Sequence, residues 1–220
     1  VLAVNMPSRF NSALTKSIAA ELAGNLGIEY LVHPIQDVVD AKLAAWRRVC
    51  GREPLPLTVE NIQARERGNI LMTVSQERGA MVVGNGNKTE FQRGYATLYG
   101  DIIGALMPLG DVHKLDVYRL GHHLDGLMGG ALPGAVFEIK ASAELSDAQD
   151  PSRGGGDPFD YHVEAPLGVE LVERSRSPEE LTALFRSRDL DPSLWVPDGE
   201  GRLVYDKLTP TAFFAPPVMV

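Results

Sequence analysis

The sequence predicts an α/β protein with an open, mostly parallel sheet, helices on both faces of that sheet, and a helical C-terminal extension. Short apolar runs alternate along the chain with longer amphipathic stretches. Parallel strands need long connections of this kind, which are usually helices. Turns that contain glycine, proline and polar residues separate the runs. The pattern therefore favours parallel strands whose crossover helices cover both faces.

Strands and helices alternate through the first part of the chain. Short apolar runs predict strands at residues 2–5, 29–33 and 80–83. Helical periodicity predicts helices at residues 15–26, 36–49 and about 58–77. Gly27 and Gly79 follow two of these helices, where glycine often forms a left-handed cap, and Thr58 is expected to cap the third.

The alternation weakens beyond Gly129. A helix is predicted at residues 114–127, before this point, and helical patterns return at residues 163–173 and 179–187. Residues 147–159 are rich in proline and glycine, which suits a mobile loop or a plain linker. We expect a main domain over residues 1–145, a flexible loop over residues 146–160 and a helical C-terminal extension over residues 161–220.

Composition limits the partners that the chain can have. Hydrophobic residues make up 44% and charged residues 23% of the 220, which is ordinary for a globular protein. The net charge of −8 argues against general nucleic-acid binding but leaves room for a local basic pocket that holds a small phosphate ligand. Neither a run of about eighteen apolar residues nor a signal-peptide pattern occurs, so we expect no membrane span.

Two smaller features concern the setting of the protein. Cys50 is the only cysteine, which excludes an internal disulfide framework and suits a reducing cytoplasm. We expect Cys50 to be a small core residue at the end of a helix. Val1 to Val4 begins directly as a strand without an initiator methionine, so we expect the chain to start inside a larger protein.

Residues 82–101, VVGNGNKTEFQRGYATLYGD, carry the most information about function. A β-branched pair runs into the turn at residues 84–87, where glycine permits positive φ and close backbone approach. Ligands of open α/β sheets bind beyond the carboxyl ends of the strands, so this turn is a candidate binding site. A tight turn before a surface helix is the alternative. The residues that follow lack an apolar period and are rich in polar and aromatic groups, which favours a site lining.

Three further places could contribute to such a site. The segment at residues 6–12 follows the opening strand and offers backbone groups and small hydroxyls to a purine edge. Asn61 and Arg65 are four residues apart on a predicted helix, so together they can bind one polar ligand; a solvated helix face would look similar. Lys114, at the start of another helix, can neutralise phosphate oxygens beside free amides.

The same residues indicate what kind of chemistry to expect. Glu90 can hold Mg²⁺, which prefers carboxylate, water and phosphate ligands, or it can simply complement the dipole of its helix. His113 is expected to be a structural or surface residue and not a catalytic one, and the adjacent His122 and His123 point apart on a helix. No nucleophile has a base beside it in the sequence, and no His/Cys cluster has zinc spacing. Positioning and charge stabilisation are therefore the expected mechanisms.

Several strings of the sequence carry a family resemblance. MPSRFNS, ENIQARERGN, GNGNKTE, GYATLYGD and KASAEL, in this order and spacing, resemble the synthetase domain of NAD synthetases, especially the glutamine-dependent bacterial type. The resemblance covers roughly residues 1–145, and GNGNKTE with GYATLYGD is its specific part. It implies a Rossmann-like fold of the adenine nucleotide alpha-hydrolase kind, in the ATP pyrophosphatase superfamily.

The resemblance also implies an activity and a set of partners. Enzymes of this family use ATP and Mg²⁺ to adenylate the nicotinate carboxylate of deamido-NAD, and ammonia then displaces AMP to give NAD⁺. Ammonia comes free or from glutamine through an upstream glutaminase domain, and the cytoplasmic enzymes pair as homo-oligomers. The implied ATP-binding residues are Met6, Asn85, Lys114 and Ser142. The implied deamido-NAD residues are Asn61, Arg65, Glu90, Asp101 and Lys207, and Glu90 is the implied metal ligand.

Departures from the family pattern qualify this assignment. The family's SGGxDS loop, which wraps pyrophosphate, does not occur in these residues. Asn85 stands where threonine is usual, Ala141 replaces a proline, and Lys207 stands in for a basic dipeptide. Two hypotheses follow. The chain is part of an NAD synthetase and is inactive alone, or it is a non-catalytic nucleotide-binding or dimerisation module that retains half of the site.

A related enzyme is a weaker alternative. Another ATP pyrophosphatase, such as a GMP or asparagine synthetase, shares the sheet and the phosphate loop. The substrate helix would discriminate between them, and Asn61 with Arg65 favours deamido-NAD as the substrate.

Overall fold

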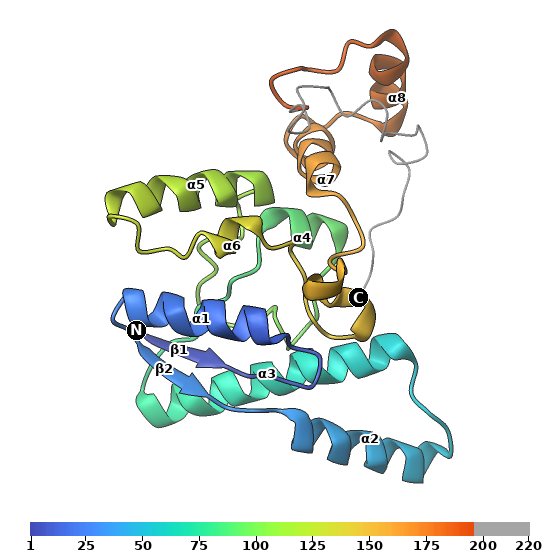
Figure 1. The fold of residues 1–220 in the computed structure, drawn as a ribbon. Coiled ribbons are helices and arrows are strands. Elements are labelled where there is room, and N and C mark those ends of the chain that lie inside the picture. Colours follow the sequence, from blue (N-terminus) through green and yellow to red (C-terminus); the bar gives the residue numbers. More distant parts are fainter. Residues whose placement is uncertain (196–220) are drawn as a thin grey trace.

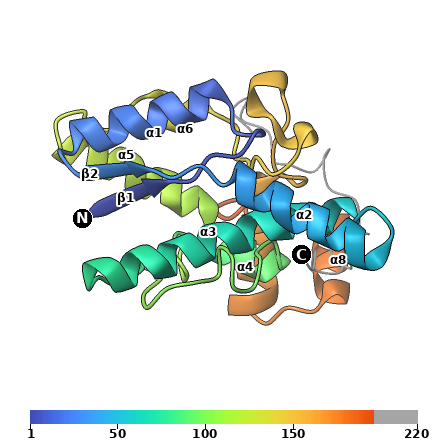
Figure 2. The ribbon, with the colours of Figure 1, turned by 90° about the horizontal axis from the view of Figure 1, so that it is seen from below.

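Two parallel strands lie between helices in the computed structural model of the protein, which describes residues 1–195. Strand β1 (Leu2–Asn5) pairs with β2 (Glu29–Val32), with Leu2 opposite Glu29 and Asn5 opposite Val32. Helix α1 (Ala13–Asn25) connects them and lies on one face of the pair, and α3 (Pro56–Arg78) lies on the other (Figures 1 and 2). The predicted α/β architecture, with parallel strands and helices on both faces, is confirmed.

Local sequence explains most ends of the first helices. Ser12 caps α1 by accepting a hydrogen bond from the Thr15 amide. Gly79 ends α3 at φ 57°, a left-handed conformation that glycine adopts without a steric penalty. The predicted cap at Thr58 is wrong, because Pro56 already occupies the first turn, where its fixed φ suits a helix start.

Helix α2 (Gln36–Cys50) supplies much of the first core. Its Ile35 cap, Val39 and Leu43 pack against Ile70 of α3, and each is at most 7% exposed. Fully burying side chains of this size contributes about 1.5–3 kcal/mol each. Cys50 ends α2, but its predicted core position is wrong, since the side chain is exposed.

The predicted strand at residues 80–83 is reduced to one bridge. Val83 pairs with Leu106 in a parallel bridge, supported by a hydrogen bond from the Gly84 amide to the Leu106 carbonyl of 2.8 Å. Met81 and Val83 are 77% and 51% exposed. The extended conformation is present, but among residues 1–195 no neighbouring strand completes a ladder beside it. Strand identity needs a hydrogen-bonding partner as well as an apolar run.

The second half of the described chain is helical. Helices α4 (Lys88–Arg93), α5 (Lys114–Leu127) and α6 (Ala135–Glu138) come first. Two 3-10 turns follow, η1 (Asp147–Gln149) and η2 (Pro151–Arg153), then α7 (Tyr161–Gly168), which continues as a π-helical segment η3 (Val169–Glu173), and α8 (Pro178–Ser187). No helix in the described range is both long and apolar enough to cross a membrane.

Helix α7 joins the C-terminal part to the rest. It packs against α4 and α5, and its Val163 and Leu167 form a second core with Leu181, Leu190 and Trp195 (Figure 1). The predicted helix at residues 163–173 is present as α7 with η3, and the one at residues 179–187 is α8. Residues 196–220, and with them Lys207, lie outside the described residues, so the extension as a whole stays a prediction.

Candidate functional site

A cavity of about 480 Å³ lies where β1, α3 and the 84–86 turn meet. We call it the central cavity. Residues that the sequence singled out line it from four separate segments: Met6, Asn85, Glu90, Asp101 and Ser142. Its other polar lining includes Asn11, Arg67, Thr97 and Glu144. The fold therefore gathers one polar site from distant parts of the sequence, beyond the end of β1 and the Val83 bridge.

Glycine is required in the 84–86 turn, although the expected reason is only half right. A Cβ at Gly84 would lie 2.8 Å from the Ile103 carbonyl oxygen, and one at Gly86 would lie 2.4 Å from the Phe91 ring. Neither glycine has positive φ. Close approach, not a left-handed backbone, therefore demands glycine here, and it lets the turn pack against both α4 and the 103–107 segment.

Glu90 has one oxygen committed to its helix and one facing the site. Its Oε2 accepts a hydrogen bond from the Asn87 amide at 3.0 Å, and Asn87 Oδ1 accepts one from the Glu90 amide at 3.2 Å. This is a capping box, so Glu90 stabilises the start of its helix through this oxygen. Glu90 Oε1 lies 3.6 Å from Lys114 Nζ. A carboxylate oxygen thus stays available to a ligand.

The oxygen ligands around Glu90 fit one mode of Mg²⁺ binding, in which the protein supplies only one or two carboxylates. Within residues 1–195 no group of three or more His, Cys, Asp or Glu side chains is arranged to hold a metal ion. Mg²⁺ is commonly held by one or two carboxylates, with water and substrate phosphates as its other ligands. Glu90, and Asp101 in the same cavity, match that mode rather than an all-protein cage.

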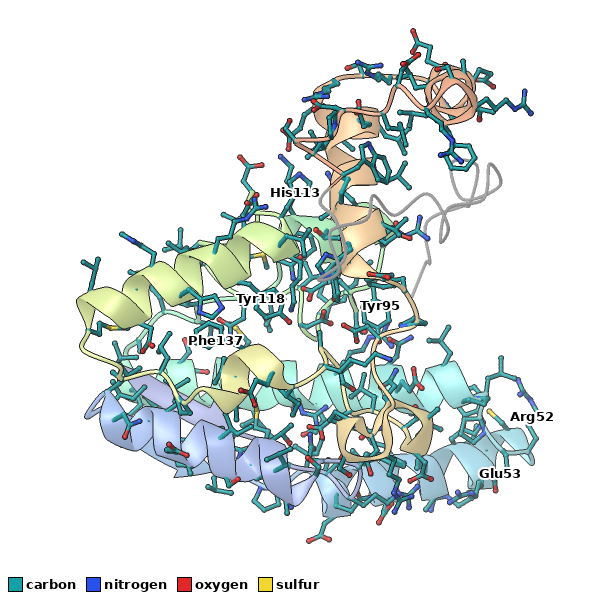
Figure 3. The ribbon with its side chains drawn as sticks, turned by 45° about the horizontal axis from the view of Figure 1, so that its top comes forward. Arg52, Glu53, Tyr95, His113, Tyr118 and Phe137 are labelled. Carbon is teal, nitrogen blue, oxygen red and sulfur yellow. The ribbon has the colours of Figure 1, made fainter. Side chains whose placement is uncertain are left out.

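Lys114 lines a second cavity of about 480 Å³, which shares Glu90, Asp101 and Ser142 with the central cavity. We call it the adjoining cavity. Two contacts hold the start of α5 in place. The Lys114 amide donates to Thr89 Oγ1 at 3.1 Å, and His113 Nε2 lies 2.8 Å from Glu173 Oε1. His113 is only 7% exposed and has the expected structural position (Figure 3).

Asp101 and Ser142 are both held by short local contacts. Asp101 Oδ1 accepts a hydrogen bond from the Thr97 amide at 2.6 Å. Burial raises the pKa of Asp101, and the hydrogen bonds from Thr97 only partly offset it. Ser142 donates to the Gln149 carbonyl and accepts a bond from the Glu144 amide at 3.1 Å. Both side chains are therefore pre-oriented at the cavity wall.

Asn61 and Arg65 do not line the central cavity. Asn61 Oδ1 accepts a hydrogen bond from Thr97 Oγ1 at 2.7 Å, and Arg65 Nε donates to the Leu98 carbonyl at 3.2 Å. The two side chains share a face of α3, as expected, and together they hold the 97–98 segment that leads to Asp101. Their part in substrate binding stays a prediction.

Arg67, Asn11 and Glu144 are residues that the sequence did not single out. Arg67 Nε donates to the Met6 carbonyl at 3.0 Å and its Nη2 to Asn11 Oδ1 at 3.1 Å. Glu144 accepts bonds from Asn11 Nδ2, the Ser12 amide and Thr15 Oγ1, at 3.2, 3.0 and 2.7 Å. All three lie in strings that carry the family resemblance, Asn11 in MPSRFNS, Arg67 in ENIQARERGN and Glu144 in KASAEL, but no local pattern marks them within these strings.

This network carries an electrostatic and a backbone cost. Burial lowers the pKa of Arg67 to about 10, while the Glu144 carboxylate opposes that shift. Glu144 is 5% exposed and has φ 47°, a left-handed conformation that is rare for a residue with a side chain. Strain of this kind persists only where the surroundings fix the residue, and here three hydrogen bonds do so.

The fold and the site define a class of protein. Parallel strands with crossover helices, and a polar cavity beyond the strand ends, are typical of α/β proteins that bind nucleotides or similar ligands. The chain belongs to the NAD synthase family, whose model matches residues 1–188.

Individual relatives agree with this assignment. The chain is 44% identical over 151 residues to a glutamine-dependent NAD(+) synthetase of Thermotoga maritima, covering 68% of this chain and 26% of that protein. It is 34% identical over 175 residues to an NH(3)-dependent NAD(+) synthetase of Chlorobaculum tepidum, covering 79% and 58%. The chain thus spans about a quarter of the length of the first relative.

Solved structures show the same fold. The glutamine-dependent NAD+ synthetase of Acinetobacter baumannii, determined in complex with ADP, matches with a TM-score of 0.61 and 28% identity, over 88% of this chain and 33% of that one. The NMN synthetase of Francisella tularensis matches with a TM-score of 0.67 over 90% of this chain and 76% of that one, at 24% identity, and shows the fold alone.

Proposed function

We propose that the chain is part of an NAD synthetase that adenylates deamido-NAD with ATP and then amidates it with ammonia, giving NAD⁺, AMP and pyrophosphate. Adenylation converts a poor carboxylate electrophile into one with a good leaving group. Such a reaction depends on holding charged groups together more than on an acid-base pair. Family membership supports this function over a non-catalytic nucleotide-binding or dimerisation module.

The observation that carries the proposal is the convergence of polar groups on the central cavity. The central cavity is lined by residues assigned to both substrates. Those assigned to ATP are Met6, Asn85 and Ser142, and those assigned to deamido-NAD are Glu90 and Asp101. Lys114 stands across the adjoining cavity with its ammonium close to Glu90. The two substrates of an adenylation must meet within bonding distance, and one shared cavity provides for that.

Lys114 and Glu90 have complementary roles in this scheme. The Lys114 ammonium binds the triphosphate and lowers the repulsion that the approaching carboxylate meets. Glu90 would hold Mg²⁺ through Oε1, while its Oε2 stays in the capping box. When bound, Mg²⁺ neutralises phosphate charge and makes pyrophosphate a better leaving group. Arg67 and Glu144 keep the Met6 segment in place beside the adenine.

We propose that the phosphate-binding half of the site is supplied by chain outside these residues, which makes residues 1–145 an incomplete domain. The SGGxDS loop is absent from the 220 residues. In the described range β1 is hydrogen-bonded to one neighbouring strand only, so its other edge is open for another. On this proposal residues 146–160 are a loop, residues 161–220 a helical extension, and the chain alone is inactive.

The finer features of the proposal concern partners. Glutamine is the proposed ammonia source, through a glutaminase domain upstream in the parent protein, and the enzyme is cytoplasmic. A homo-oligomer is proposed because the enzymes that this chain resembles pair in that way. Light scattering after size exclusion tests the oligomer, and a monomer at micromolar concentration would remove it.

A direct assay of the full-length protein tests the function. It supplies ATP, Mg²⁺ and deamido-NAD with either ammonium or glutamine, and measures NAD⁺, AMP and pyrophosphate. Equal amounts of the three products are expected with both nitrogen donors, and none from the 220-residue chain alone. No NAD⁺ with either donor would overturn the proposal, and NAD⁺ with ammonium only would remove the glutaminase partner.

A further inference from the structure

Tyr161, the first residue of α7, reaches from the C-terminal part of the chain into the site. Its hydroxyl oxygen lies 2.7 Å from Asp157 Oδ2 and 3.4 Å from Glu90 Oε1. The Lys114 Nζ lies 5.2 Å from the centre of its ring. One side chain therefore contacts both the proposed phosphate-binding ammonium and the proposed metal-binding carboxylate.

The hydroxyl has a single proton, and the shorter contact shows where it goes. The Tyr161 hydroxyl donates to Asp157 Oδ2, because that contact is the shorter of the two. Asp157 is 8% exposed, and its Oδ1 has no hydrogen-bond partner in the described part of the chain. Asp157 thus uses its bonded oxygen to hold the tyrosine, and the ring cannot swing away without breaking a hydrogen bond to a buried carboxylate.

Aromatic contacts fix the ring plane as well. Tyr161 packs edge-to-face with Phe159 at 5.0 Å between ring centres, and Phe159 packs in the same way with Tyr95 at 5.2 Å. Tyr118, one turn along α5 from Lys114, places a second ring 5.8 Å from the ammonium (Figure 3). The Lys114 ammonium thus lies within cation-π range of two tyrosine rings and 3.6 Å from Glu90 Oε1.

We infer that Tyr161 is a positioning residue for the ATP triphosphate, with its ring holding the Lys114 ammonium beside Glu90 and Asp157 anchoring that ring. This rests on the proposed function and deepens it, because it assigns part of the site to residues beyond 145. The attraction between the ring and the ammonium is weaker than that of a close ion pair, so Lys114 can move from the ring to a phosphate when ATP binds. An ammonium held in this way does not collapse onto Glu90.

The test is the affinity of the full-length protein for α,β-methylene-ATP with Mg²⁺, measured by calorimetry. This analogue cannot release pyrophosphate, so the measurement does not require NAD⁺ formation. Tyr161→Leu is expected to weaken binding about three- to tenfold, the range of a partly buried cation-π contact. Tyr161→Phe keeps the ring and should bind within about twofold of the wild type.

Two further variants separate positioning from packing. Phe159→Leu removes a ring that orients Tyr161 but contacts neither Lys114 nor Glu90 among the described residues, so it should weaken binding less than Tyr161→Leu does. Asp157→Ala should weaken binding in the wild type and should weaken it less in the Tyr161→Leu background, because part of its effect is transmitted through that ring. If Tyr161→Leu fails to fold, Asp157→Ala alone carries the test.

The outcomes are distinct. Unchanged affinity in Tyr161→Leu, or equal loss in Phe159→Leu, would overturn the inference. So would additive losses in the double variant. In the activity assay, Tyr161→Leu should raise the KM for ATP and leave that for deamido-NAD unchanged. A wild type that binds the analogue yet makes no NAD⁺ would overturn the proposed function and leave the role of Tyr161 standing.

Discussion

Arg67 and Asn11, 56 residues apart in the chain, are joined by a hydrogen bond of 3.1 Å from Arg67 Nη2 to Asn11 Oδ1. Arg67 lies on α3, and Asn11 belongs to the loop that follows β1. The same guanidinium donates to the Met6 carbonyl, so a single side chain fixes the segment proposed to face adenine. Asn11 in turn donates to Glu144, which ties the 142–145 segment to the same loop.

Arg67→Ala is therefore expected to lower the free energy of unfolding of the 220-residue chain by about 2–4 kcal/mol. The variant removes charge-assisted hydrogen bonds, takes away the donor to the Met6 carbonyl and leaves the buried Glu144 carboxylate without its nearby cation. Urea unfolding followed by circular dichroism measures the change. Arg78→Ala is the matched control, because its ion pair with Glu29 is half exposed and should contribute only about 0–1 kcal/mol. Equal effects from the two variants would show that the Arg67 network is not a structural centre.

Glu90→Gln is expected to depress kcat of the full-length enzyme on the order of 100-fold while changing the KM for ATP much less. Glutamine can still serve a capping box, so the variant removes the charge without removing the cap. Charge stabilisation matters chiefly in the transition state, which is why turnover should suffer more than binding.

Glu180→Gln provides the matched control for Glu90. Glu180 forms the same capping box with Ser177 at the start of α8, away from the cavities. It should leave kcat unchanged. If Glu90→Gln also turns over at the wild-type rate, Glu90 is a helix-start residue and nothing more.

Elements defined by local sequence were predicted from it, and an element defined by distant partners was not. The bounds of β1 and of α5 match their predictions residue for residue, because apolar periodicity and the turns around them are local signals. The prediction of a strand at residues 80–83 was wrong because a strand depends on contacts that are not local. An apolar run shows that a segment can be extended, but its ladder depends on partners elsewhere in the chain.

The residues of the candidate site also fall into those that local sequence could identify and those that it could not. The 84–90 turn was found because glycine, asparagine and glutamate stand together in sequence. Glu144 was missed because its role comes from Asn11, Ser12 and Thr15, which lie 129 to 133 residues earlier. Tyr161 was missed because only the packing of α7 on α4 and α5 brings it to Glu90. Contacts of this range are not encoded in any local window.

Asp101→Asn is expected to remove a pH dependence of stability. Burial raises the pKa of Asp101 above its ordinary 3.8. Between that value and the raised folded pKa the unfolded chain loses the proton while the folded chain keeps it, so the free energy of unfolding falls as pH rises. Asparagine has no proton to lose and can still accept from the Thr97 amide. The stability of the variant relative to wild type should therefore increase as pH rises through 3.8 and should level off above the raised pKa of the folded protein.

Asp150→Asn gives a control of opposite sign for Asp101. Hydrogen bonds from Ser152 lower the pKa of Asp150, so its stabilising effect is present above pH 3.8 and is lost as pH falls. The relative stability of that variant should decrease as pH rises toward 3.8 and should then stay constant. Urea titrations at several pH values measure both differences. A flat difference for Asp101→Asn would show that its carboxyl is solvated like an ordinary surface group.

Arg65→Ala is expected to raise the KM of the full-length enzyme for deamido-NAD about tenfold and to leave the KM for ATP unchanged. Arg65 holds the Leu98 carbonyl and Asn61 holds Thr97, so the variant loosens the segment that carries Asp101 without touching the Lys114 side of the site. Arg52→Ala is the control, because Arg52 lies at the far end of the molecule from Tyr95 and Tyr118 (Figure 3). A rise in the KM for ATP alone would show that this face of α3 serves the nucleotide instead of deamido-NAD.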